Sequence, residues 1–111
     1  MPTLNLPPPV GPALDQLKRE LGKVYGSRLR GVYLYGSYAR NEADKDSDVD
    51  VLIALSGLVQ SGLEISRINA LVSQICLQSD LLISTFPVSL ESWEKGRSPF
   101  LMCVRKEAVP L

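Results

Sequence analysis

Three short apolar runs alternate with longer segments of helical periodicity along this chain of 111 residues. The runs are Val32–Tyr35, Asp48–Leu55 and Asp80–Thr85, and Pro87 is expected to end the last of them. Their short length and their β-branched and aromatic residues are typical of buried strands, whereas helices need about ten or more residues. The alternation predicts an α/β (α+β) domain in which helices flank a small sheet, parallel or mixed, of three strands or slightly more.

The intervening segments carry apolar residues three or four positions apart, as amphipathic helices do. Ser61 and Glu64 match a capping box, so Ser61 is expected to be an N-cap. The expected helices run from about Ala13 to Gly26, from Ser37 to about Glu42, from Ser61 to about Cys76, over 89–96 and over 98–108.

Residues 1–12 contain five of the eight prolines of the chain. Proline is excluded from helix interiors and central strands, so we expect a mobile or extended arm there. The remaining residues, 13–111, are expected to form one domain, because a chain of this length can bury one core but not two.

Lysine and arginine number 12, aspartate and glutamate number 12, and histidine is absent. The lack of histidine excludes His-ligated metal sites and histidine-dependent triads. Zero net charge argues against nucleic acid as a binding partner, because the surface lacks the excess of basic groups that binds phosphates. The sequence shows neither a membrane-spanning run nor a signal peptide, so we expect a soluble cytoplasmic protein. Cys76 and Cys103 are expected to be buried free thiols.

The segment after the first expected strand combines a turn suited to anions with paired carboxylates. Gly36 and Ser37 lie where the strand gives way to a helix, and backbone N–H groups at such a turn can bind phosphate. Asp48 and Asp50 are expected to point to one strand face, roughly 6.5–7 Å apart, and their hard oxygen ligands suit Mg²⁺ or Mn²⁺. Asp80 opens the third strand and joins them if the two strands are neighbours. Three carboxylates beside a phosphate site are the components of two-metal phosphoryl or nucleotidyl transfer.

This segment resembles the signature of the DNA polymerase beta-like nucleotidyltransferase superfamily, which is Gly-Ser, ten residues and Asp-x-Asp. Ten residues separate Ser37 from Asp48, and the run 47–51 (Ser-Asp-Val-Asp-Val) is similar to that of small members. Arg40 stands where those members usually have arginine. The likeness is greatest to the minimal nucleotidyltransferases, which are often encoded beside HEPN-domain proteins as toxin–antitoxin pairs, and covers about residues 14–107.

The resemblance also implies roles for the residues. The carboxylates would hold two Mg²⁺ ions, and the one from the third strand would act as base or only as metal ligand. The turn would bind the β- and γ-phosphates of ATP, while Arg40 would contact phosphate or pair with a carboxylate. The candidate catalytic and metal-binding residues are Asp48, Asp50 and Asp80, and the candidate nucleotide-binding residues are Gly36, Ser37 and Arg40.

The function implied is a Mg²⁺-dependent transfer of AMP from ATP to a hydroxyl of a partner protein. By resemblance the partner is a HEPN-type ribonuclease toxin, which the chain silences as antitoxin within a hetero-oligomer. About 99 residues remain after the arm, near the minimum for a catalytic unit, so we expect the acceptor to dock to the surface of this chain, as a cognate protein can do. Two alternatives stay open: a non-catalytic module that neutralises a toxin by binding, and a subunit of a small-molecule nucleotidyltransferase.

Overall fold

A four-stranded mixed sheet forms the centre of the protein in a computed structural model that describes residues 6–111. Its strand order is β3-β2-β1-β4. β1 (Leu29–Tyr35) is antiparallel to β2 (Val49–Leu55) and to the short β4 (Val109–Pro110), whereas β2 is parallel to β3 (Ile83–Ser89). The expected small mixed sheet is confirmed, and β4 is the strand that the apolar runs did not reveal.

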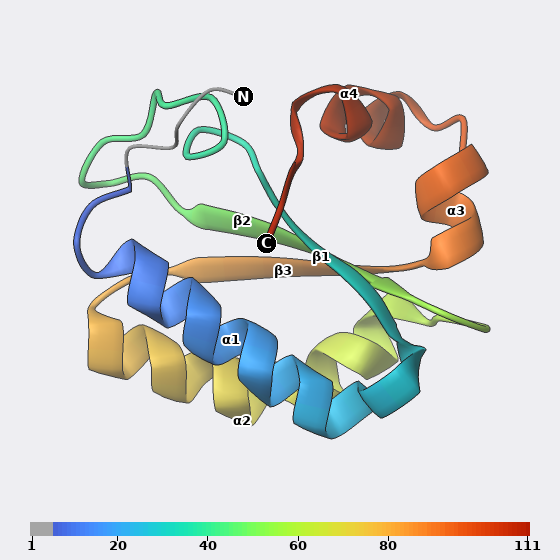
Figure 1. Cartoon of the computed structure of the whole chain (residues 1–111), viewed down its shortest axis with the longest axis horizontal. Helices are drawn as coiled ribbons and strands as arrows, with labels where there is room; N and C mark the ends of the chain where they lie inside the picture. Colours follow the sequence, from blue (N-terminus) through green and yellow to red (C-terminus); the bar gives the residue numbers. More distant parts are fainter. Residues whose placement is uncertain (1–5) are drawn as a thin grey trace.

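Helices cover both faces of this sheet (Figure 1). α1 (Val10–Tyr25) and α2 (Ser61–Ser79) lie side by side across one face, and α3 (Leu90–Lys95) and α4 (Pro99–Glu107) lie over the other. A 3-10 turn, η1 (Gly26–Arg28), joins α1 to β1. Among residues 6–111, no helix has both the length and the apolar character needed to cross a bilayer.

The central strand β2 contributes to two cores, because its side chains alternate between the sheet faces. Leu52 and Ala54 pack with Trp93 beneath α3 and α4. Asp50 shares their face and lies one row nearer the start of the strand, so the fold places a carboxylate at the edge of this layer. The residues buried against α1 and α2 are Val49, Val51, Ile53 and Leu55, each worth about 1.5–3 kcal/mol of burial.

The helix boundaries differ in part from the sequence expectation. α1 begins at Val10 rather than near Ala13, and Pro12 lies in its first turn. Proline is tolerated there because the first N–H groups of a helix have no partner within it. The expected helix over 37–42 is wrong, since these residues form turns. Residues 1–5 of the expected arm lie outside the described residues.

The two terminal helices begin as the sequence predicts. Ser89 caps α3 by accepting a hydrogen bond from the Ser92 N–H, and Ser98 caps α4 by accepting one from the Leu101 N–H. Cys103 on α4 is exposed, so the expectation of a buried thiol is wrong there, while Cys76 is half-buried.

The third strand begins three residues later than expected. Asp80 is the C-cap of α2 in a left-handed conformation with φ 56°, and β3 starts at Ile83. Pro87 lies within β3 instead of ending it. Proline fits this strand because β3 is at the edge of the sheet, where one row of N–H groups needs no ladder partner.

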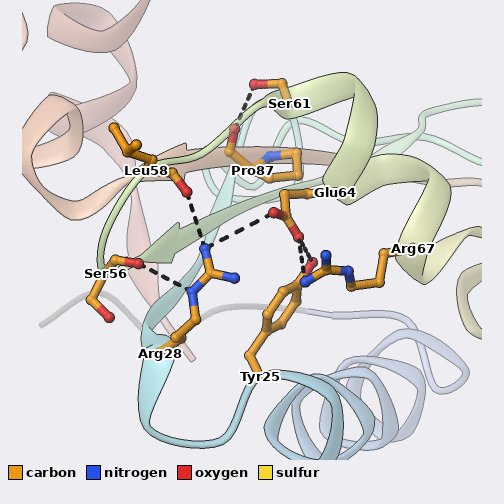
Figure 2. Close-up of polar contacts among 8 residues, drawn as sticks. All are labelled: Tyr25, Arg28, Ser56, Leu58, Ser61, Glu64, Arg67 and Pro87. Atoms are coloured by element: carbon orange, nitrogen blue, oxygen red, sulfur yellow. Dashed lines mark hydrogen bonds and ion pairs between the residues drawn. The ribbon is translucent and has the colours of Figure 1, made fainter.

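Among the described residues, the fold buries one charged side chain, that of Glu64, which is 3% exposed. Its carboxylate accepts a hydrogen bond from Tyr25 Oη at 2.9 Å and faces the guanidinium groups of Arg67 (3.4 Å) and Arg28 (3.9 Å), as Figure 2 shows. Burial and the hydrogen bond to Glu64 raise the pKa of Tyr25 to about 12. This cluster ties the end of α1 to the start of α2.

The expected capping box of Ser61 and Glu64 is wrong, because both side chains have other partners. Gln60 is the N-cap of α2, and Ser61 donates its hydroxyl hydrogen to the carbonyl of Pro87 at 2.9 Å (Figure 2). The local pattern matched a cap, but tertiary partners for both side chains took precedence.

Candidate active site

The turn after β1 lies against the carboxylate of β2. Tyr35, the last residue of β1, pairs with Asp50, and Gly36 follows with φ 75°. L side chains rarely adopt this conformation. A Cβ at Gly36 would also overlap the Asp50 carboxylate. Glycine is thus needed at position 36 both for the backbone conformation and for space. Because it has no side chain, the turn can lie directly against the Asp50 carboxylate.

The residues after Gly36 form a compact turn without a regular helix. The Arg40 N–H donates to the Gly36 carbonyl at 3.2 Å, and the Glu42 N–H donates to the Ser37 carbonyl at 2.9 Å. Asn41 has φ 57°, a left-handed conformation that asparagine tolerates better than most residues. The turn keeps the half-buried Ser37 at the end of β1.

The paired carboxylates lie at the amino end of β2. Asp48 is exposed and directly precedes the strand, while Asp50 is its second residue and is half-buried. The loop before them is ordered by Asp44, whose carboxylate accepts hydrogen bonds from the Asp46 N–H (2.8 Å) and the Ser47 hydroxyl (3.3 Å). A short loop tied in this way fixes where the strand begins and thus where both acids lie.

The electrostatic surroundings of Asp50 are unfavourable for a carboxylate. Burial raises its pKa above the ordinary value, Asp48 raises it further, and Glu107 adds to the rise, while Arg40 opposes it. Burial, Asp50 and Glu107 likewise raise the pKa of Tyr35. Negative charges gathered around one cationic side chain favour the binding of a further cation.

Glu107, the last residue of α4, is a residue of this region that the sequence did not reveal. Its carboxylate lies 2.6 Å from Arg40 Nη1, and Arg40 Nε lies 3.2 Å from the carboxylate of Glu42. Arg40 therefore joins the turn after β1 to the last helix. The structure thus shows carboxylate pairing for Arg40, and contact with a nucleotide stays a prediction. Only the tertiary fold brings Glu107 here, because 67 positions separate the two residues.

Asp80 is not the residue of β3 that pairs with Asp50. The β3 partner of Asp50 is Ser84, and Asp80 lies at the end of α2, ahead of the strand. Within the described part of the chain, no three or more acidic, cysteine or histidine side chains are grouped so as to hold a metal ion. Asp50 lies against Gly36, Asp48 precedes the first residue of β2, and a role for Asp80 beside them stays a prediction.

Residues 14–91 match the nucleotidyltransferase domain family, a range that includes the Gly36–Ser37 turn and the two aspartates at the amino end of β2. The chain belongs to this family. It is a nucleotidyltransferase, as the motif predicts.

Known proteins of this kind share its sequence and fold. A protein of Methanocaldococcus jannaschii named as a putative protein adenylyltransferase is 35% identical over 71 residues, which cover 64% of this chain and 71% of that protein. A solved structure described as a putative minimal nucleotidyltransferase superposes with a TM-score of 0.56 at 29% identity, covering 90% of this chain and 91% of that one. The expected minimal nucleotidyltransferase fold is confirmed.

Two solved toxin–antitoxin structures share the fold at lower identity. One, determined with AMP-PNP, has a TM-score of 0.56 at 17% identity and covers 84% of this chain and 68% of that chain. The other, of a mutant MntA–HpeT pair, has a TM-score of 0.54 at 14% identity over 85% and 68% of the two chains.

Proposed function

We propose that this nucleotidyltransferase transfers AMP from ATP to a hydroxyl group of a partner protein, and that it acts on that partner as an antitoxin. The Methanocaldococcus relative supports AMP as the group and protein as the acceptor. The toxin–antitoxin structures of the same fold, one with AMP-PNP, support an ATP-binding antitoxin. The resemblance to minimal nucleotidyltransferases supports a HEPN-type ribonuclease as the partner.

The observation that carries the proposal is the close approach of Gly36 to Asp50. A Cβ at position 36 would occupy the space of the carboxylate, so the backbone of the turn and the acid border the same space. Phosphates bound by the turn would therefore lie beside the carboxylates of β2. Transfer of a nucleotidyl group needs this adjacency, because the phosphates that leave and the phosphorus that is attacked are neighbours in ATP.

Asp48 and Asp50 are the residues that would hold Mg²⁺. Their oxygens are the hard ligands that this ion prefers, and the raised pKa of Asp50 reports a carboxylate that a cation would stabilise. Bound there, Mg²⁺ would neutralise phosphate charge during transfer. Asp80 is proposed as the third carboxylate, which requires that the corner between α2 and β3 bring it toward Asp50.

The remaining steps belong to residues of this chain. Ser37 and the backbone of the turn would hold the β- and γ-phosphates. Arg40 has an exposed side chain between two carboxylates and can turn toward the phosphates. The acceptor oxygen forms a bond to the α-phosphorus while the bond to pyrophosphate breaks, and the hydroxyl proton passes to a carboxylate, for which Asp80 is the proposed base.

The experiment uses the protein encoded beside this chain as acceptor, with Mg²⁺ and ATP labelled at the α-phosphate. We expect the label on the acceptor and a mass increase of one AMP, and no label from ATP labelled at the γ-phosphate. Asp50→Asn should abolish labelling, whereas Asp46→Asn, which alters an exposed aspartate of the preceding loop, should retain it. Tight binding of the two proteins without transfer of any of the four nucleotides would refute the enzyme and support a non-catalytic antitoxin.

A further inference from the structure

A cavity of about 580 Å³ lies between β3, the layer formed by α3 and α4, and the entry to α2, where Val59 and Ser61 line it. Its lining includes Phe86 of β3 and Phe100 of α4, and serine hydroxyls that include Ser92 and Ser98. The proposed phosphate and metal residues do not line it. We propose that this cavity binds the nucleobase of the nucleotide substrate, an inference that rests on the proposed function.

The strand order determines on which side of the carboxylates the cavity lies. β2, which carries Asp50, has β1 on one side and β3 on the other. The Gly36 turn follows β1, whereas Phe86 belongs to β3. In an extended nucleoside triphosphate the α-phosphorus lies between the two departing phosphates and the nucleoside. With those phosphates at Gly36 and the α-phosphorus at Asp50, the nucleoside points toward β3.

The distance along β3 suits the ribose. Ser84 is the strand partner of Asp50, and Phe86 follows two residues later on the same face of the sheet. Two residues of strand span about 6.6 Å, which is comparable with the separation that a ribose imposes between phosphate and base. The cavity therefore begins where the base of a nucleotide bound at Asp50 would lie.

The lining offers aromatic surface to a planar ligand. The ring centroids of Phe86 and Phe100 are 5.0 Å apart. Phe100 also makes an edge contact with Tyr35, with ring centroids 5.9 Å apart. Phe100 nevertheless remains 44% exposed, so part of its ring is open to a base. Stacking on such rings is the common way to hold a base without reading its sequence identity. The hydroxyls of Ser92 and Ser98 can bond to the polar edge of the base.

The test compares two magnesium complexes, those of ATP and of inorganic tripolyphosphate, by titration calorimetry on the whole chain. The phosphates are common to both ligands, so only ATP can use the cavity. We expect ATP to bind at least tenfold more tightly than tripolyphosphate. Phe100→Ala should weaken ATP binding about tenfold, as loss of a stacking ring does, and leave tripolyphosphate binding unchanged. Met102→Ala is the matched control, because Met102 is 47% exposed on the same helix and does not line the cavity.

Equal affinity for ATP and tripolyphosphate, or equal losses from Phe100→Ala and Met102→Ala, would overturn the nucleobase site while leaving the phosphate site intact. Binding of neither ligand would refute the proposed function itself, and the inference with it. If Phe100→Ala weakens binding of the acceptor protein instead of ATP, the cavity is a docking site for that protein and the nucleobase assignment is wrong.

Discussion

The two ends of β2 hold carboxylates in opposite circumstances. Beyond its carboxyl end, Glu64 is buried but faces Tyr25, Arg28 and Arg67 (Figure 2). At its amino end, Asp50 is half-buried beside two other carboxylates, and Arg40 is the cation that lowers its pKa. The first acid is satisfied by the fold and serves stability. The second is left at an electrostatic cost, which is typical of a binding or catalytic site.

The largest expected effect comes from removing both acids of the amino end. Asp48→Asn combined with Asp50→Asn should lower transfer at least a thousandfold, about 4 kcal/mol in transition-state stabilisation, because the metal-binding oxygens are lost. Initial rates with labelled ATP measure this. The fold should remain, as circular dichroism would show. Transfer within a factor of three of wild type would remove these residues from the site.

Gly36→Ala tests the contact that joins the two halves of the motif. The new methyl group would overlap the Asp50 carboxylate and strain a backbone with φ 75°. We expect about a hundredfold loss of transfer and a destabilisation of about 1–2 kcal/mol in urea unfolding. The matched control is Gly22→Ala within α1, where nothing lies within 4 Å of the added carbon. That substitution should leave transfer unchanged and raise stability by up to about 1 kcal/mol.

Glu64→Ala tests the acid beyond the carboxyl end of β2. It should reduce stability and leave transfer almost unchanged. It leaves the buried Tyr25 hydroxyl without its acceptor and removes the shared partner of two guanidinium groups, which costs about 2 kcal/mol of unfolding free energy. Transfer per folded molecule should change less than twofold. Glu20→Ala is the control, since it breaks an exposed pair with Lys23 and should cost at most about 0.5 kcal/mol. A thousandfold loss of transfer from Glu64→Ala would contradict the division between the two ends.

Asp80→Asn should have a smaller effect on transfer than the loss of the β2 acids. Asparagine keeps the left-handed C-cap of α2, so the fold is preserved. Because the carboxylate must move to reach Asp50, we expect about a tenfold loss of rate, equivalent to about 1.4 kcal/mol. A thousandfold loss would show that Asp80 is as important for transfer as Asp48 and Asp50 together, and an unchanged rate would exclude Asp80 from the site.

The motif was predictable because its parts are local, and the errors arose where the sequence carries no local boundary signal or where distant residues decide. The spacing from Ser37 to Asp48 and the alternation along β2 are properties of continuous sequence. The start of β3 was misplaced because Asp80 adjoins an apolar run with no boundary signal, although a left-handed C-cap ends α2 there. The partner of Glu64 and the approach of Glu107 to Arg40 depend on tertiary packing, which a local pattern does not encode.

The smallest expected effect concerns pH and stability, and it uses the raised pKa of Asp50. A carboxyl whose pKa is higher in the folded than in the unfolded state destabilises the fold when ionised. That cost is fully present above the folded pKa and disappears as the pH falls below the unfolded value. Asp50→Asn should therefore raise the Tm by about 2 °C at pH 7, and the gain should vanish near pH 3.

Glu64→Gln should lower the Tm at pH 7, because the Glu64 carboxylate faces cations and a hydroxyl donor. Equal shifts of the same sign from both substitutions would show that the two ends of β2 do not differ electrostatically, and thermal melts from pH 3 to pH 8 decide the matter.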